Sequence, residues 1–101
     1  MFIKDYGNDI VINVDMICRF SILQTEGSRD EYDVELSMAY SDIVKFKGFN
    51  SRLEAEHFID VIIEFKFRED PKLPSVSYDF IMATVKARMR GNELGVCQRL
   101  L

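Results

Sequence analysis

The sequence predicts an α+β fold, in which an antiparallel four- to five-stranded meander sheet is packed by one long helix and followed by a second helix and a short C-terminal tail. Apolar and polar residues alternate through positions 31–40, as is typical of a strand with one buried face. A helix start followed by a long apolar run begins at position 51. Every connection between the expected strands is too short for a crossover helix, so neighbouring strands are expected to run antiparallel.

The 101 residues fit a single domain. We expect the sheet within residues 1–48, the first helix within 51–68, and the second helix with the tail within 75–101.

The first three strands are expected over residues 2–6, 10–14 and 18–22. A bend or bulge is expected near Asp15, because this polar residue interrupts the alternation. The polar segment 25–30 contains glycine and lies between two alternating runs, so it is expected to be a hairpin loop.

The strand at 31–40 has the clearest pattern, and a short strand at 43–46 completes the meander. One face of the clear strand is apolar and the other polar: Tyr32, Val34, Leu36, Met38 and Tyr40 against Asp33, Glu35 and Ser37. This alternation predicts that the first set packs on the core.

The first helix has a capping box, because Ser51 is followed three positions later by Glu54. Its apolar residues cover about 200° of the helix circumference, twice the minimum for a helix that lies on one surface. They are Ala55, Phe58, Ile59, Val61, Ile62, Ile63 and Phe65. Such a face needs two partners: the sheet, and either the C-terminal segment or a second subunit.

Residues 75–90 fit two patterns. Tyr78, Ile81, Met82, Val85 and Met89 form a helical stripe. A strand-like alternation also runs through the start of this segment, from position 76 to 82. We favour a helix, which Gly91 would end after a basic last turn.

The order of several strands and one helix over residues 1–67 resembles, in outline, the pleckstrin-homology-like shape. No ligand or binding residue follows from that outline.

Composition and charge favour a water-soluble protein, and we expect a cytoplasmic location. The net charge is −4, which argues against generic nucleic-acid binding. No apolar run is long enough to span a membrane, and residues 1–5 lack the pattern of a signal peptide. Cys18 and Cys97 are expected to be small buried apolar residues rather than a disulfide.

The residue pattern predicts no catalytic site, no metal site and no cofactor. His57 is the only histidine, and we interpret it as a surface residue. An enzyme or small-ligand pocket that uses His57 with Asp60 or Glu64 stays open as an alternative. No phosphate-binding glycine motif and no zinc spacing occurs.

Two further functions can be read from the C-terminal half. The bases Lys86, Arg88 and Arg90 are an alternative site for weak nucleic-acid contact. The leading hypothesis is instead a small non-enzymatic protein-interaction module, such as an adaptor or inhibitor, which forms a homodimer or binds another protein. Apolar residues in excess of the expected core motivate it. The candidate partner-binding residues are Ile63, Phe67, Phe80, Met89, Leu100 and Leu101.

Overall fold

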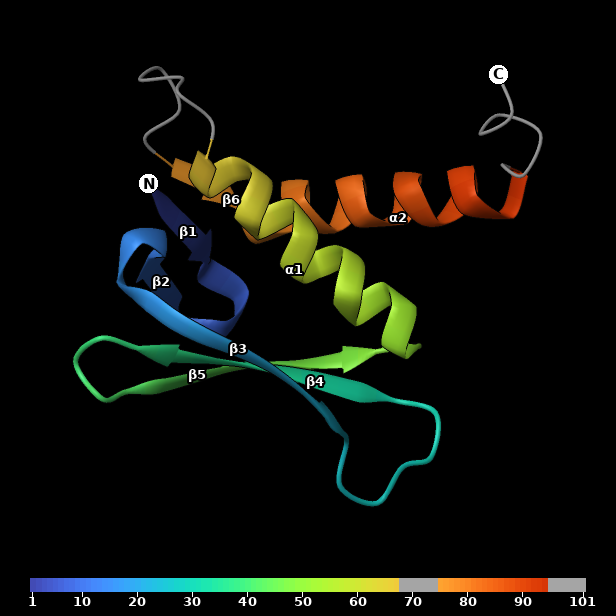
Figure 1. Cartoon of the computed structure of the whole chain (residues 1–101), viewed down its shortest axis with the longest axis horizontal. Coiled ribbons are helices and arrows are strands. Elements are labelled where there is room, and N and C mark those ends of the chain that lie inside the picture. Colours follow the sequence, from blue (N-terminus) through green and yellow to red (C-terminus); the bar gives the residue numbers. More distant parts are fainter. Residues whose placement is uncertain (68–74, 95–101) are drawn as a thin grey trace.

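The computed structural model describes residues 1–67 and 75–94, the last three of them by their backbone only. These residues form an α+β structure with two three-stranded sheets and two helices (Figure 1). The elements are β1 (Phe2–Asp5), β2 (Ile10–Asn13), β3 (Ile17–Gln24), β4 (Tyr32–Met38), β5 (Ile43–Phe49), α1 (Arg52–Phe67), β6 (Ser75–Ser77) and α2 (Tyr78–Leu94), with 3-10 turns η1 (Tyr6–Asn8) and η2 (Val14–Met16).

The expectation of a single meander sheet was wrong for the N-terminal strands. β1 pairs with β2 antiparallel and with β6 parallel, which gives the N-terminal sheet the order β2-β1-β6. The bend expected near Asp15 is present as η2, where the Asn13 side chain accepts a hydrogen bond from the Asp15 N–H. This turn separates β2 from β3, and β3 therefore begins a second sheet.

The second sheet, called here the meander sheet, has the order β3-β4-β5 with both pairings antiparallel. On the apolar face of β4, Val34, Leu36 and Met38 are buried as expected, Tyr32 is half-buried, and Tyr40 lies beyond the strand and is exposed. Asp33 belongs to the face expected to meet solvent, yet it is buried. Its carboxylate is satisfied by the Thr25 hydroxyl, which donates a 2.7 Å hydrogen bond.

The strand β5 extends three residues beyond the predicted end. A register shift near its end gives β5 one extra residue opposite β4, and Gly48 adopts φ = 85° there. Because of this bulge, Phe46 and Phe49 both lie in the core although three positions separate them. Phe49 is therefore a core residue and is 1% exposed.

The helix α1 starts where the capping box predicts. The Glu54 N–H donates to the Ser51 hydroxyl at 3.1 Å, and the Glu54 carboxylate reaches back to accept from the Asn50 N–H at 3.2 Å. The expected last residue, 68, lies outside the described residues.

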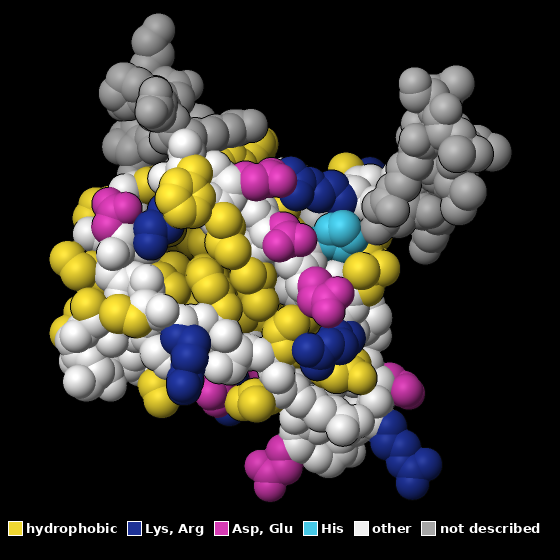
Figure 2. Space-filling view, in the orientation of Figure 1, with side chains coloured by type: hydrophobic (Ala, Val, Ile, Leu, Met, Phe, Trp, Pro, Cys, Tyr) yellow, Lys and Arg dark blue, Asp and Glu magenta, His cyan; other side chains and the backbone are white. Residues whose placement is uncertain are grey.

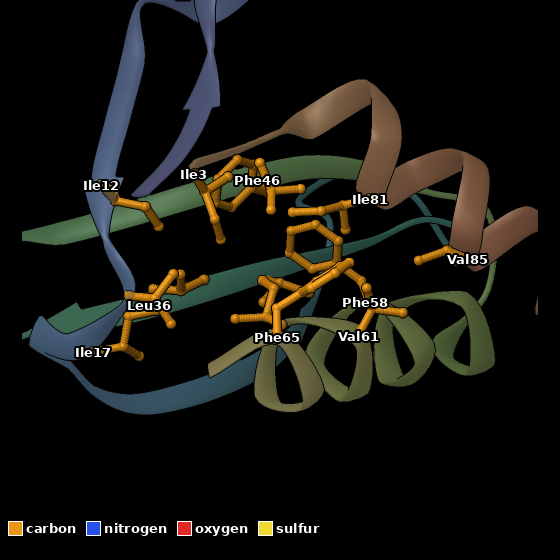
Figure 3. Packing of buried hydrophobic residues seen from close by; sticks show 14 of the residues in the cluster. Ile3, Ile12, Ile17, Leu36, Phe46, Phe58, Val61, Phe65, Ile81 and Val85 are labelled. Atoms are coloured by element: carbon orange, nitrogen blue, oxygen red, sulfur yellow. The ribbon is translucent and has the colours of Figure 1, made fainter. Parts of the chain in front are cut away.

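Most of the broad apolar face of α1 is covered within the same chain, although Ile59 and Ile63 are only half-buried. Its residues Phe58, Val61 and Phe65 point into a core to which α2 contributes Ile81 and Val85 (Figure 3). The second partner of the helix is thus the C-terminal segment, one of the two alternatives that the sequence left open.

The ambiguous C-terminal segment contains both elements, a three-residue strand and then a helix. The Ser77 hydroxyl accepts a hydrogen bond from the Phe80 N–H and caps α2. The expected stop at Gly91 was wrong, because α2 continues to Leu94. No helix among residues 1–67 and 75–94 has both the length and the apolar run that crossing a membrane requires.

Candidate functional site

The strand β3 is an edge strand of the meander sheet. It is hydrogen-bonded to β4 on one side, and no strand of the described residues pairs with its other side. Its core-facing residues Phe20 and Ile22 are only half-buried. Their direct neighbours on β4, Leu36 and Val34, are both fully buried. The core therefore covers β4 but leaves the inner face of β3 partly open.

The other sheet margins are shorter or carry more charge. The edge strand β5 carries Lys45 and Lys47, and lysines are typical of an edge strand protected against further pairing. The edge strands of the N-terminal sheet, β2 and β6, have four and three residues. In contrast, β3 has eight residues, and Arg19 is its only charged side chain. Among the described strands, β3 is the longest edge with the least protection.

The outward flank of α1 adds an apolar surface. Ile59, Ile63 and Phe67 follow one another at four-residue intervals, so they share one side of the helix. Ile59 and Ile63 are half-buried, and Phe67 is 74% exposed. We call these three residues the α1 flank.

The α1 flank faces the β3 side of the molecule. The opposite side of α1 carries Glu64 and meets α2, where Glu64 forms an ion pair with Arg88. The helix α1 also contacts β3 and the turn η2. Figure 2 shows hydrophobic side chains gathered between α1 and β3. The α1 flank and the open inner face of β3 thus border one apolar surface.

The six residues predicted to contact a partner do not form one surface. Ile63 and Phe67 lie on the α1 flank. Phe80 is 57% exposed and lies on the side of α2 that meets α1, where its ring is 6.1 Å from that of Phe65. Met89 is nine residues further along α2, which places it about 180° around the helix from Phe80. It is half-buried against the core.

The remaining two predicted contact residues, Leu100 and Leu101, lie outside the described residues. The ring of Phe80 borders a cavity of about 100 Å³ between the helices, lined by Val61, Glu64, Phe65, Phe80, Thr84 and Arg88.

The histidine alternative rests on residues of the polar side of α1. His57 is half-buried and Asp60 is exposed. The Glu64 carboxylate accepts hydrogen bonds from both terminal nitrogens of Arg88, one of them at 3.1 Å from Nη1 to Oε1. This pairing raises the pKa of Arg88 above its ordinary value, against the opposing effect of burial. Glu64 thus serves as an ion-pair partner that joins the two helices.

The same ion pair divides the basic cluster of α2. Arg88 turns toward α1, whereas Lys86 and Arg90 are exposed. The three bases therefore do not lie on one surface, and Arg88 is paired with Glu64.

A polar site that the sequence analysis did not identify surrounds Tyr78. Burial raises the pKa of Tyr78 above 10.0, and the negative charges of Asp5, Glu54 and Asp79 raise it further. Asp5 is buried and accepts a 2.9 Å hydrogen bond from the Asn8 side chain. The alternation of Ile3 with Asp5 was the signal for this inward carboxylate. A cavity of about 170 Å³ lies beside it, lined by Lys4, Asp5, Tyr6, Gly7, Ser77, Tyr78 and Asp79.

Cys18 is exposed, so the expectation of a buried thiol was wrong for this residue. The register of β3 against β4 shifts between Ile17 and Arg19, which leaves Cys18 out of the pairing and turned away from the core. Cys97 lies outside the described residues. Within residues 1–67 and 75–91, no group of three or more His, Cys, Asp or Glu side chains is placed to hold a metal ion.

Comparison with known proteins gives no match: no family model, no curated protein and no solved structure is significantly similar to this chain.

Proposed function

We propose that this chain is a small, non-enzymatic protein-interaction module that binds through the α1 flank and the neighbouring inner face of β3. The observation that carries the proposal is the exposure of Phe67 near half-buried Ile63, on a helix that contacts β3, whose inner residues are also half-buried. An apolar surface that combines a helix flank with a strand margin is typical of a protein contact.

The buried part of the broad apolar face of α1 does not support the proposal, because the sheets and α2 cover it. Support comes from the α1 flank, where Ile59 and Ile63 of that face are only half-buried and Phe67 beyond them is exposed. The partner is either a second copy or another protein, and an adaptor or inhibitor would use such a surface in the same way.

The double variant Ile63→Ser/Phe67→Ser tests this proposal. Both residues lie outside the closed core, so the variant should fold with an unchanged circular dichroism spectrum. Association should be measured by light scattering over a concentration series, and by affinity purification with each protein as bait. Tyr40→Ser is a matched control, since Tyr40 is an exposed aromatic residue beyond the end of β4.

We expect the wild type and Tyr40→Ser to associate with themselves or retain the same partner, and the double variant to lose this association. Equal association by all three proteins, or a wild type that neither self-associates nor retains any protein, would refute the proposal.

A further inference from the structure

The open margin of β3 identifies a partner more closely than apolar exposure alone. Along this eight-residue strand, the backbone donors and acceptors on the side away from β4 pair with no other described strand, so they form a template for a further strand. We propose that a second copy of this chain fills it, with β3 of the two copies paired antiparallel about a two-fold axis that passes beside Ser21. The proposal rests on the proposed function and names its partner.

In this register, the side chains on β3 of one copy are complementary to those on β3 of the other copy. Around a centre at Ser21, Phe20 lies opposite Ile22 of the other copy, and Arg19 lies opposite Leu23. Phe20 with Ile22 is an aromatic and β-branched pair, which favours antiparallel pairing. Arg19 therefore faces the apolar side chain of Leu23, and not the like charge of Arg19 in the other copy. A centre at Arg19 would place two like charges directly opposite each other, which is unfavourable.

Pairing in this register also completes the half-open core. A two-fold axis perpendicular to the sheet keeps the inner faces of both copies on the same side. The row formed by Ile22, Val34 and Phe46 then continues into Phe20 of the second copy. The second copy then covers the half-buried residues Phe20 and Ile22. The two meander sheets form one six-stranded sheet, and both α1 flanks lie on the same face of it.

Charge placement gives the first test, with the dimer dissociation constant measured by sedimentation equilibrium. In Leu23→Lys the introduced lysine would face Arg19 of the other copy twice per dimer, because the interface is symmetric. Within its own chain the lysine would lie opposite Asp33, so folding should not suffer. We expect the dissociation constant to rise about tenfold, and less in 1 M NaCl.

The double variant Arg19→Glu/Leu23→Lys should restore dimerisation to within about threefold of the wild type, because opposite charges then face each other across the axis. Ile43→Lys is the matched control. Ile43 is an exposed residue on the same face of the sheet but on β5, so its dissociation constant should change less than about twofold.

A cross-link tests the register. In a chain that carries Cys18→Ser and Cys97→Ser, Ser21→Cys should form an intermolecular disulfide, because directly opposite residues of antiparallel strands are about 5 Å apart at Cβ. Ser37→Cys on the central strand β4 is the control and should remain reduced under the same oxidation.

The outcomes separate this inference from the proposed function. Loss of dimerisation in Leu23→Lys, recovery in the double variant and a cross-link at position 21 support it. A wild type that remains monomeric but retains another protein through the α1 flank overturns the inference and leaves the proposed function standing. The same conclusion follows if Ile63→Ser/Phe67→Ser abolishes dimerisation and Leu23→Lys does not affect it. A wild type that neither dimerises nor retains a partner overturns both.

Discussion

Replacing Phe58 by alanine should remove a large part of the stability of the chain. Phe58 is fully buried on α1, and its ring lies 5.2 Å from Phe46, 4.9 Å from Phe49 and 6.0 Å from Tyr78, centroid to centroid. It therefore joins the meander sheet to both helices. Truncation of a buried phenylalanine costs about 3–5 kcal/mol. With rings on three sides that cannot all move into the space, we expect about 4 kcal/mol.

The matched comparison is Phe67→Ala, nine residues further along the same helix. Phe67 is mostly exposed, so its truncation should change the free energy of unfolding by less than about 0.5 kcal/mol. Urea unfolding followed by far-UV circular dichroism measures both. At a slope of about 1.3 kcal/mol per M, the Phe58 variant should lose about 3 M in its midpoint or fail to fold, and the Phe67 variant less than about 0.4 M.

A Phe58→Ala cost below about 1.5 kcal/mol would refute the central position of this ring. A Phe67→Ala cost equal to that of Phe58→Ala would show that the α1 flank is packed in the isolated monomer, and would remove the basis of the proposed interaction surface.

Three further predictions concern polar groups. Ser51→Ala should destabilise the chain by about 1 kcal/mol in urea unfolding, because it removes the acceptor that caps α1; no change would mean that this cap contributes nothing. Asp5→Asn should lower the pKa of Tyr78 in an ultraviolet titration, since the Asp5 charge helps to raise it. Because the folded-state pKa of Tyr78 lies above its unfolded value, this tyrosine contributes stability below pH 10.0 that is lost as pH rises through the folded pKa, and a gain in stability over that range would contradict the assignment. A double-mutant cycle with Glu64→Ala and Arg88→Ala should give a coupling below about 1 kcal/mol, because both side chains are partly exposed; a coupling above about 2 kcal/mol would mean that this pair is a main support of α2.

The parts of the fold that the sequence predicts are those set by local rules. The capping box at Ser51 and Glu54 involves neighbouring residues, so its pattern is sufficient to locate the start of α1. The alternation through β4 is equally local, because one face of the strand packs on the core along most of its length.

The N-terminal sheet was missed because its decisive contact is not local. β1 pairs with β6, a three-residue strand more than 65 positions away, and no periodicity in residues 75–77 distinguishes such a short strand from the first turn of the helix that follows. The sequence analysis did not identify Phe49 as a core residue, for a related reason. Its inward direction depends on a bulge at Gly48, and an extra residue in one strand reverses the alternation on which the prediction depends.

The sequence predicted which kind of residue forms the candidate surface, but not where these residues lie in the fold. Phe67 and Phe80 were identified as surplus aromatic residues, and both are exposed. Their separation onto different sides of the helix pair depends on where α2 packs, which only the tertiary structure defines. One feature of the sequence indicates that β3 is an unprotected edge strand: the run from Ile17 to Gln24 has a single charge.

The parallel pairing of β1 with β6 has a consequence for how the chain is made. The first strand emerges early in synthesis, but the neighbour that completes its sheet follows only after α1. Until then, Ile3 lacks Val76, its direct neighbour on β6, while the meander of β3 to β5 can already form from adjacent segments. We therefore expect the meander sheet to form before the N-terminal sheet. A nascent chain stalled before Ser75 would expose an incomplete N-terminal sheet to other chains.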